Sequence, residues 1–301
     1  MSDTKLLADV GEAADVVRVT SPETVALPPA IDRWVRRLLL PDRSRAWNPG
    51  ALAAAIAQHV RTPFEVVYAT GNPYSSYLLA RALSMVIRRP YVLDMRDAWR
   101  LRGNYRPGNF VREARLARME RQTLEGAAHV VFATAPMEAR YQAEYPALVG
   151  RSSTIINGFD EDDYPARPYT TPPLTPADPV YFTHVGTWTS YVRPDALFAA
   201  FQRARDQDPA FAARARLRMA GRFGANEADR AAFEASLDAH GLRPAFEHLG
   251  YVDHPRAVEL QRTADALVLV TSGLPDEQQA KTAEYLAAGR PVVALVDPGT
   301  P

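Results

Sequence analysis

Two kinds of hydrophobic pattern alternate along most of the chain. Runs such as 180–185 and 266–270 are almost continuously apolar or β-branched, as in strands buried on both faces. Between such runs, apolar residues recur every three or four positions; in 74–87 they include Leu79 and Leu83. The alternation predicts an α/β fold whose parallel sheets are covered by helices on both faces.

The expected elements follow one another in a regular order. The expected strands are 64–70 (interpreted as buried), 90–94, 129–133, 153–156, 180–185, 217–220, 246–249, 266–270 and 291–296. The expected helices are 74–87, 109–126, one opened by Pro136, 194–205, 225–240, 255–263 and 278–288, the last stopped by Gly289. In such folds, ligands bind on the loops at the carboxyl ends of the strands.

A proline-rich segment divides the chain into two domains. Six prolines lie between positions 165 and 179, so this stretch fits neither a helix nor a central strand and is interpreted as a stiff linker. We expect an N-terminal domain at 1–165, a linker at 166–179 and a C-terminal domain at 180–301. A length of 301 residues fits two domains.

Both ends are expected to be incomplete. The start is interpreted as the first helix of a Rossmann unit followed by its second strand at 16–20, with no first strand or glycine-rich loop before them. The chain stops soon after the last expected strand. We expect a fragment of a longer protein.

Composition excludes several classes of function. Lysine and arginine together number 35, as do aspartate and glutamate, so no bulk positive charge favours nucleic acid as a partner. The absence of cysteine excludes disulfides, thiolate zinc sites and cysteine nucleophiles. No apolar run approaches the ~20 residues of a membrane helix, and the start carries no signal-peptide pattern. We expect a cytoplasmic protein.

Two loops of the first domain are candidate ligand sites. Segment 94–99 follows a strand and contains Asp94, Arg96, Asp97 and Trp99; its charges either form an ion pair that steadies the sheet edge or meet a polar ligand. Segment 70–76 opens a helix, where amides bind anions. Within it, Asn72 is interpreted more readily as a helix cap than as a ligand.

The first turn of the second domain is a further candidate. Gly186 permits close backbone approach to a ligand, and Thr187 follows it. Arg193 stands at the start of the next helix, where its charge favours a diphosphate. His184 is expected to pack in the core, and Arg222, in a Gly-x-x-Gly turn, is weak evidence by itself.

The strongest candidate segment is 271–293. A strand leads to a polar loop with Thr271 and Ser272, and the next helix carries Lys281, Thr282 and Glu284. A glutamate on that turn accepts two hydrogen bonds from a ribose diol, while lysine, threonine and helix amides hold phosphate. The competing interpretation is a surface glutamate favoured by the helix dipole.

Arginines are frequent in segment 88–121, and they recur every three residues from position 112 to position 121. This spacing makes them drift around a helix, so a solvated basic helix is the favoured interpretation. The alternative is a surface that contacts anionic lipid or a lipid-diphosphate acceptor.

Four segments resemble family 4 of the GT-B glycosyltransferases in the family's own order. Segment 94–99 resembles its Asp-x-Arg-Asp-x-Trp loop, and 120–134 resembles a helix and strand of its first domain. Segment 155–160, Ile-Ile-Asn-Gly-Phe-Asp, resembles the end of that domain, and 281–293 resembles the nucleotide-sugar helix.

The resemblance implies two Rossmann-like domains that face a cleft, with the donor in the C-terminal domain and the acceptor in the N-terminal one. It implies a retaining, hexosyltransferase-type enzyme of cell-envelope or exopolysaccharide synthesis that needs neither metal nor cofactor. The catalytic residues it implies are Arg193, Lys281 and Glu284. The donor contacts that it implies are Gly186, Thr187, Arg222, Thr271, Ser272 and Thr282. The acceptor-side contacts that it implies are Asn72, Arg96, Asp97 and Trp99.

The sequence departs from the family pattern at two positions. Thr187 follows Gly186 where many members have arginine, and Asp276 stands where many have glutamate. Two alternatives therefore stay open: an inactive glycosyltransferase-like scaffold subunit and a sugar-nucleotide epimerase of the same fold. A dinucleotide oxidoreductase is disfavoured, because no Gly-x-Gly-x-x-Gly opens a βαβ unit.

Overall fold

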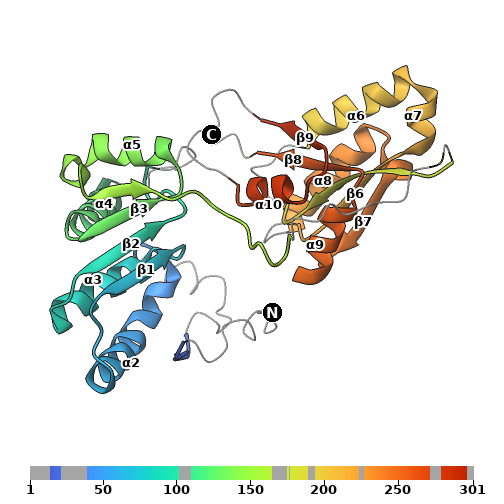
Figure 1. Ribbon diagram of the computed structural model, residues 1–301. Coiled ribbons are helices and arrows are strands. Elements are labelled where there is room, and N and C mark those ends of the chain that lie inside the picture. The colour runs from blue at the N-terminus through green and yellow to red at the C-terminus, as the bar shows by residue number, and fades with distance from the viewer. Residues whose placement is uncertain are drawn as a thin grey trace. The chain divides into compact units, whose positions relative to one another are not determined.

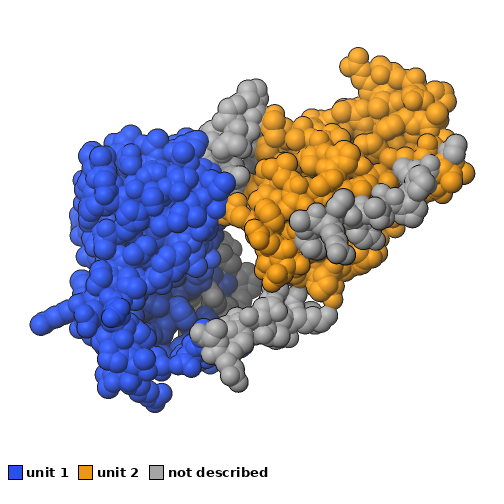
Figure 2. All heavy atoms as spheres, viewed as in Figure 1, with its two compact units in different colours: residues 1–156, 301 blue, residues 157–300 orange. Residues whose placement is uncertain are grey.

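The computed structural model describes residues 14–21, 39–101, 110–164, 175, 177–188, 194–223, 227–271 and 279–296. The chain divides into two compact units, residues 1–156 with residue 301, and residues 157–300 (Figure 2). Each unit contains one parallel β-sheet with helices between its strands (Figure 1). The expectation of an α/β protein with two Rossmann-like sheets is confirmed.

The sheet of the first unit has the strand order β1-β2-β3-β4. Its strands are β1 (Val67–Gly71), β2 (Tyr91–Met95), β3 (His129–Phe132) and β4 (Ser152–Thr154). Its helices are η4 (Arg43–Trp47), α2 (Asn48–Arg61), α3 (Ser75–Ile87), α4 (Phe110–Glu125), α5 (Ala135–Glu144) and η5 (Pro146–Leu148). Every pairing is parallel, so the loops after β1, β2 and β3 lie at one edge of the sheet.

The central strands of this unit are buried, but β1 is not. Leu93 and Met95 of β2 and Phe132 of β3 are fully buried in one hydrophobic cluster. In β1, Val67 and Ala69 pack against that cluster, whereas Tyr68 between them is 59% exposed. The interpretation of 64–70 as a buried strand is therefore wrong, because alternate side chains of an edge strand face opposite ways.

The expected strand at 16–20 is also wrong. These residues lie in no strand, and Val16 and Val17 are more than half exposed. The carbonyl of Val19 accepts a hydrogen bond from Trp47 Nε1 at 3.0 Å, which holds the segment through a side chain. The helix expected before it lies outside the described residues.

The sheet of the second unit has the order β7-β6-β5-β8-β9. Its strands are β5 (Val180–Val185), β6 (Ala215–Ala220), β7 (Phe246–Gly250), β8 (Ala266–Val270) and β9 (Val292–Leu295). Its helices are α6 (Asp195–Gln207), α7 (Pro209–Arg214), α8 (Glu227–Ala239), η6 (Arg243–Ala245), α9 (His254–Thr263) and α10 (Lys281–Ala287). The chain first builds outwards from β5 to β7 and then returns to add β8 on the other side, so the topological switch point lies between β5 and β8.

Strand β8 shows how this sheet is covered on both faces. Its residues Val268 and Val270 pack in a cluster with Phe198 of α6 and Phe233 of α8. The alternate residues, Leu267 and Leu269, pack in another cluster with Val258 of α9 and Tyr285 of α10. All five residues of β8 are buried, which explains its continuous apolar sequence.

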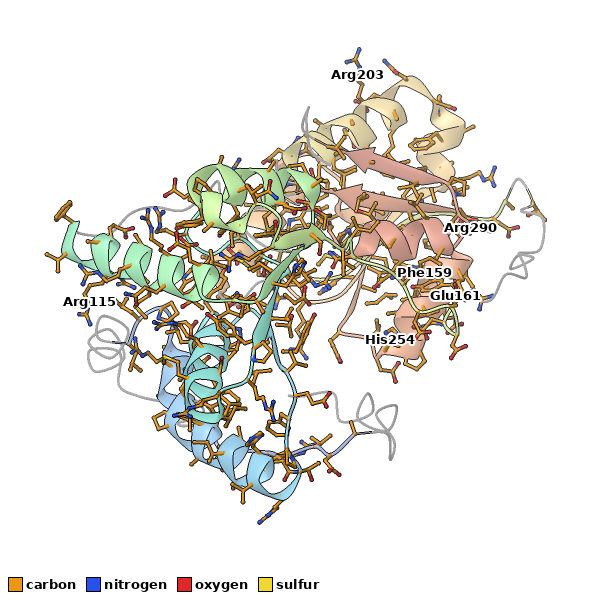
Figure 3. The ribbon with its side chains drawn as sticks, turned by 60° about the vertical axis from the view of Figure 1, so that its left-hand side comes forward. Arg115, Phe159, Glu161, Arg203, His254 and Arg290 are labelled. Atoms are coloured by element: carbon orange, nitrogen blue, oxygen red, sulfur yellow. The ribbon has the colours of Figure 1, made fainter. Side chains whose placement is uncertain are left out.

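Residues 157–164 belong to the second unit. Tyr164 is buried in the same cluster as Leu267 and Tyr285. Asp163 Oδ2 lies 2.7 Å from Nε2 of His254, which is labelled in Figure 3. The division after Ile156 thus comes earlier than the expected boundary at 165, because this segment packs on α9 and α10. Most of the expected linker, residues 165–174 and 176, lies outside the described residues.

Candidate functional site

The carboxyl ends of β5 and β8 flank the switch point of the second sheet. After β5 the chain continues through Gly186 and Thr187, and after β8 through Thr271. Helix α10, which begins at Lys281, packs against β8. Parallel sheets of this order bind ligands in the crevice at such a switch point. The structure therefore brings most of the described donor-side candidates to one edge of one sheet.

Lys281 lies directly over the turn at Gly186. A methyl group built on Gly186 would fall 2.1 Å from Cε and 2.2 Å from Nζ of Lys281. Gly186 has a φ of +147°, a conformation that glycine adopts without strain. Behind it, a methyl group built on Gly221 would fall 2.0 Å from the Gly186 carbonyl oxygen. The two glycines let the turns after β5 and β6 pack closely and leave room for the lysine.

The electrostatics around Lys281 favour an anionic ligand. Burial lowers the pKa of Lys281, and the carboxylate of Glu284, one helical turn away, acts in the opposite direction. Burial and the charge of Lys281 lower the pKa of His184 to about 3, although its hydrogen bond to the Val268 carbonyl opposes the shift. His184, packed below the turn as expected, is therefore neutral, and Lys281 brings a cationic side chain to this turn.

Glu284 is held by a chain of hydrogen bonds that leads into the core. Its Oε2 accepts a hydrogen bond from Gln261 Nε2 at 2.9 Å. The Oε1 of Gln261 in turn accepts a hydrogen bond from the hydroxyl of Tyr164. Neither Gln261 nor Tyr164 was predicted from the sequence. The available signal was a glutamine beside Leu260 on the buried side of α9, where a side-chain amide needs partners.

Tyr285 fixes α10 to the end of β5. Its hydroxyl accepts a hydrogen bond from the Val185 amide at 2.9 Å and lies 3.3 Å from the Val185 carbonyl, to which it donates. The side chain is 1% exposed, and burial raises its pKa. Tyr285 thus positions Lys281 and Glu284 on the same helix relative to Gly186, a role not expected from the sequence.

The other described donor-side candidates are Thr187, Arg222, Thr271 and Thr282. Thr187 is exposed, and the guanidinium of Arg222 lies 4.2 Å above the ring of Tyr251. The amide of Thr271 donates to the Leu295 carbonyl at 3.1 Å, and that of Thr282 to the Gln279 carbonyl at 3.0 Å. Three predicted positions, Arg193, Ser272 and Asp276, lie outside the described residues.

In the first unit, Asp94 and Arg96 form an ion pair. Arg96 Nε lies 2.8 Å from Asp94 Oδ1, and its Nη1 donates to the Ile155 carbonyl at 3.1 Å. This pairing matches the interpretation of a brace at the sheet edge, since it joins the end of β2 to the chain after β4. Asp97 is half-buried beside it.

Trp99 lies in the hydrophobic core. Its side chain is 5% exposed and stacks on Tyr74, with ring centroids 5.4 Å apart and an interplanar angle of 2°. Its amide donates to the hydroxyl of Tyr141 at 2.8 Å. This indole therefore supports the loop from within and does not present its ring to solvent.

A buried carboxylate anchors the same loop and was not predicted. Glu120 of α4 is fully buried and accepts hydrogen bonds from the amide and Nε of Arg100, at 3.0 and 3.1 Å. The hydroxyls of Tyr141 and Tyr145 donate to it at 3.1 and 2.6 Å. Four donors offset the cost of burying this group and fix the end of the loop after β2.

The interpretation of Asn72 as a helix cap is wrong. The first amide of α3, that of Ser75, donates to Asp42 Oδ2 at 2.9 Å. Asn72 itself is exposed. A carboxylate from 33 residues upstream thus occupies the place where a ligand anion was expected, a long-range contact that the local pattern does not encode.

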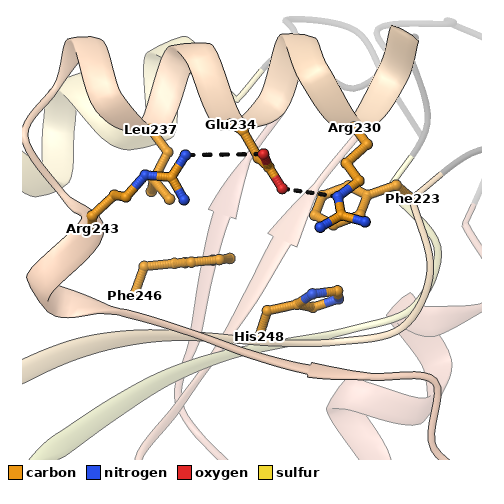
Figure 4. Close-up of a pocket in the computed structure, with 7 residues that line it drawn as sticks. All are labelled: Phe223, Arg230, Glu234, Leu237, Arg243, Phe246 and His248. Carbon is orange, nitrogen blue, oxygen red and sulfur yellow. Dashed lines mark hydrogen bonds and ion pairs between the residues drawn. The ribbon is translucent and has the colours of Figure 1, made fainter. Parts of the chain in front are cut away.

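A separate pocket of about 280 Å³ lies between α8 and the edge strand β7 (Figure 4). Phe246 and His248 face the charged side chains of α8 across it. Arg230 pairs with Glu234 at 2.8 Å, and Arg243 pairs with Glu234 and Asp238. Because these charges neutralise one another, a diphosphate gains less here than beside Lys281.

Both units match families of glycosyltransferases. Residues 6–151 match the glycosyl transferase 4-like domain, and residues 179–301 match the glycosyl transferases group 1. Two successive Rossmann-like units that match these families define the GT-B class. The chain belongs to the GT-B glycosyltransferases.

Solved structures share the fold at low sequence identity. HepE of Anabaena in complex with UDP-glucose is 20% identical, with a TM-score of 0.56 over 81% of this chain and 63% of that chain. Sucrose-phosphate synthase from Thermosynechococcus elongatus is 17% identical, with a TM-score of 0.62 over 92% of this chain and 64% of that chain. The chain thus spans less than two thirds of either protein. No curated protein sequence matches it.

Proposed function

We propose that the chain transfers a sugar from a nucleotide-sugar donor to a glycan or lipid-linked acceptor. The observation that carries this proposal is the position of Lys281 over Gly186 at the switch point, with Glu284 one turn further along α10. In this proposal the two side chains act on different parts of a nucleoside diphosphate. The cation neutralises the diphosphate, and the carboxylate accepts hydrogen bonds from the ribose hydroxyls.

The nucleotide sugar is the donor class that the neighbouring structures favour. HepE binds UDP-glucose in its crystal structure, so a hexose on a nucleoside diphosphate is the natural first candidate. Thr282, whose side chain is half-buried beside Lys281, is assigned to the diphosphate as well. Arg193 and Ser272 complete the proposed donor site on the strength of the sequence resemblance alone.

The proposed reaction retains the configuration at the anomeric carbon. The bond between that carbon and the diphosphate oxygen breaks, and a bond to the acceptor oxygen forms on the same face. The acceptor's proton passes to the departing phosphate oxygen, so no protein nucleophile is needed. Negative charge grows on the diphosphate as it leaves, and Lys281 stabilises it without a metal ion.

The acceptor side of the proposal rests on the first unit. Asn72, Arg96 and Asp97 follow β1 and β2, two neighbouring parallel strands, and so lie at one sheet edge. The buried side chains of Trp99 and Glu120 support the loop after β2 from the core of the unit. A role in cell-envelope or exopolysaccharide synthesis is the proposed context of such an acceptor.

We also propose that α4 contacts a membrane that contains anionic lipid. At its start, Phe110 and Val111 are 86% and 67% exposed. Arg115 and Arg118 follow on the exposed surface of the helix, where Figure 3 shows Arg115 pointing away from the unit. No helix among the described residues is long and apolar enough to cross a membrane. Sedimentation with phosphatidylglycerol vesicles, and its loss in Phe110→Ser/Arg115→Glu, tests this contact.

A thermal titration tests the donor site. The chain is titrated with UDP-, GDP-, ADP- and TDP-sugars while its unfolding is followed. At 100 times the dissociation constant, a bound donor adds about 2.7 kcal/mol to the free energy of unfolding. We expect one nucleotide class to raise the midpoint and the substitution Lys281→Met to weaken that effect. A well-folded chain that responds to no donor would contradict the proposal and favour a scaffold subunit.

A further inference from the structure

The side chain that contacts Glu284 comes from a different helix. Gln261 of α9 is 3% exposed, and its Nε2 donates to Glu284 Oε2 at 2.9 Å. Within the described part of the chain, the other oxygen, Oε1, accepts no hydrogen bond from the protein. One carboxylate oxygen is thus held by the protein, and the other is left for a ligand.

The chemistry of the partners fixes the orientation of the Gln261 amide. A carboxylate only accepts hydrogen bonds, so the NH₂ group of the amide must face Glu284. The amide oxygen then faces Tyr164, whose hydroxyl donates to it. Burial raises the pKa of Tyr164, and the negative charge of Glu284 raises it further, so the hydroxyl keeps its proton.

Tyr164 and Gln261 lie in a buried region, where a polar group without a hydrogen-bond partner lowers stability. Tyr164 is 7% exposed and packs with Leu267 and Tyr285, while Gln261 lies next to the buried Leu260. A buried amide that lacks either partner is strongly disfavoured relative to one in water, so this arrangement resists rotation of the amide. A rigid donor gives the Glu284 carboxylate one preferred rotamer.

We propose that Gln261, oriented by Tyr164, is the positioning residue that aims Glu284 Oε1 at the ribose hydroxyls of the donor. The inference rests on the proposed function, in which Glu284 binds the ribose. It predicts that Gln261 acts on recognition of the ribose hydroxyls and not on the phosphates, which Lys281 holds. The effect of a Gln261 substitution on nucleotide affinity must therefore depend on the presence of both Glu284 and the ribose hydroxyls.

The experiment compares two ligands on the full chain. The probes are the nucleoside diphosphate that stabilises the protein most among UDP, GDP, ADP and TDP, and its 2′,3′-dideoxy counterpart. The dissociation constant of the dideoxy ligand is divided by that of the ribose ligand, both measured by calorimetry. This ratio reports recognition of the ribose hydroxyls. We expect Gln261→Met, which keeps the length of the side chain, to reduce this ratio about tenfold, the size of one lost hydrogen bond to a charged group. The dideoxy ligand should bind both proteins equally.

Two variants keep the test decisive. Gln202→Met is the matched control, because it removes an amide that donates to Asp206 at 2.8 Å on the exposed side of α6. It should leave the ratio unchanged. Tyr164→Phe keeps the ring in its cluster and removes only the hydroxyl, so it should lower the ratio even if Gln261→Met fails to fold.

The outcomes separate this inference from the proposed function. If the unaltered protein shows no preference for the ribose hydroxyls, or Glu284→Ala leaves the preference intact, the ribose assignment itself fails. If Glu284→Ala abolishes the preference but Gln261→Met and Tyr164→Phe do not change it, only the positioning role is overturned. Equal weakening of both ligands by Gln261→Met would also overturn it. Adding Gln261→Met to Glu284→Ala should produce no further loss.

Discussion

At Gly186 the absence of a side chain leaves room for Lys281, the lysine of the proposed donor site. We expect Gly186→Ala to lower the affinity for nucleoside diphosphates at least about tenfold, because the new methyl group would displace Lys281 from a position 2.1 Å away. Its φ of +147° adds backbone strain of about 1–3 kcal/mol. Isothermal calorimetry measures the affinity, and chemical denaturation measures the stability.

Gly241 provides the control for that substitution. It also has a positive φ, +63°, but a methyl group built on it meets nothing within 4 Å. Gly241→Ala should therefore destabilise the fold and leave nucleotide affinity unchanged. If both alanine variants bound nucleotide as tightly as the unaltered protein, Lys281 would not depend on the space over Gly186.

His184 should make stability depend on pH in the acidic range. Its pKa is about 3 in the folded chain and 6.5 in the unfolded one, so only the unfolded chain binds a proton between these values. The stabilisation from neutral His184 is complete above about pH 6.5 and is lost as the pH falls towards 3. Over this range it contributes a slope of about 1.4 kcal/mol per pH unit.

The variant His184→Gln isolates this contribution from that of the carboxylates. Urea unfolding at several pH values between 3 and 7 should give a shallower loss of stability for the variant than for the unaltered protein. Parallel curves for the two proteins would show that His184 gains access to solvent or to a proton-stabilising partner in the folded state.

At the scale of elements, the start of α3 depends on a distant carboxylate. Asp42→Ala should cost about 1 kcal/mol of stability, because the Ser75 amide loses the acceptor that lies 2.9 Å away. Asp42→Asn keeps an acceptor oxygen and should cost less. Asn72→Ala should leave stability unchanged, since Asn72 is not the cap. Thermal unfolding of the three variants checks this order, which a larger loss in Asn72→Ala would contradict.

The elements predicted best from the sequence are those whose pattern reflects burial. Strand β5 and strand β8 have the predicted bounds, and α6, expected at 194–205, buries Leu197, Phe198 and Phe201 on one face. Strand β8 is apolar at every position and α6 along its buried face, so their local pattern and their environment agree, although β5 also buries Thr183 and His184. The residues at 16–20 are also mostly β-branched, but they pair with no strand within the described part of the chain, and composition alone does not supply a partner.

The candidate site was predictable only where it follows strand ends. Lys281 and Gly186 were singled out because loops at the carboxyl ends of strands bind ligands. The supporting residues were not, because Gln261, Tyr164 and Glu120 act through contacts 20 or more residues apart in sequence. A buried polar residue on an otherwise apolar helix face is a local signal, but its partner is defined only by the fold.

At the scale of the whole molecule, the two units have separate cores and are expected to respond separately to the donor. In the proposed function, the nucleotide contacts only residues of the second unit. Saturating nucleotide should therefore slow hydrogen exchange in peptides from β5, β8 and α10. At 100 times the dissociation constant, amides that exchange through unfolding of that unit slow by up to about 100-fold.

Peptides from β2 and β3 of the first unit serve as the internal reference and should exchange at the same rate with and without nucleotide. Their core residues Leu93 and Val130 belong to one hydrophobic cluster of the first unit. The substitution Leu93→Ala should speed exchange in β2 and β3, since a buried leucine-to-alanine change costs about 2–5 kcal/mol. Nucleotide should not reverse that effect. Protection of β2 or β3 by nucleotide alone would instead place part of the donor site on the first unit.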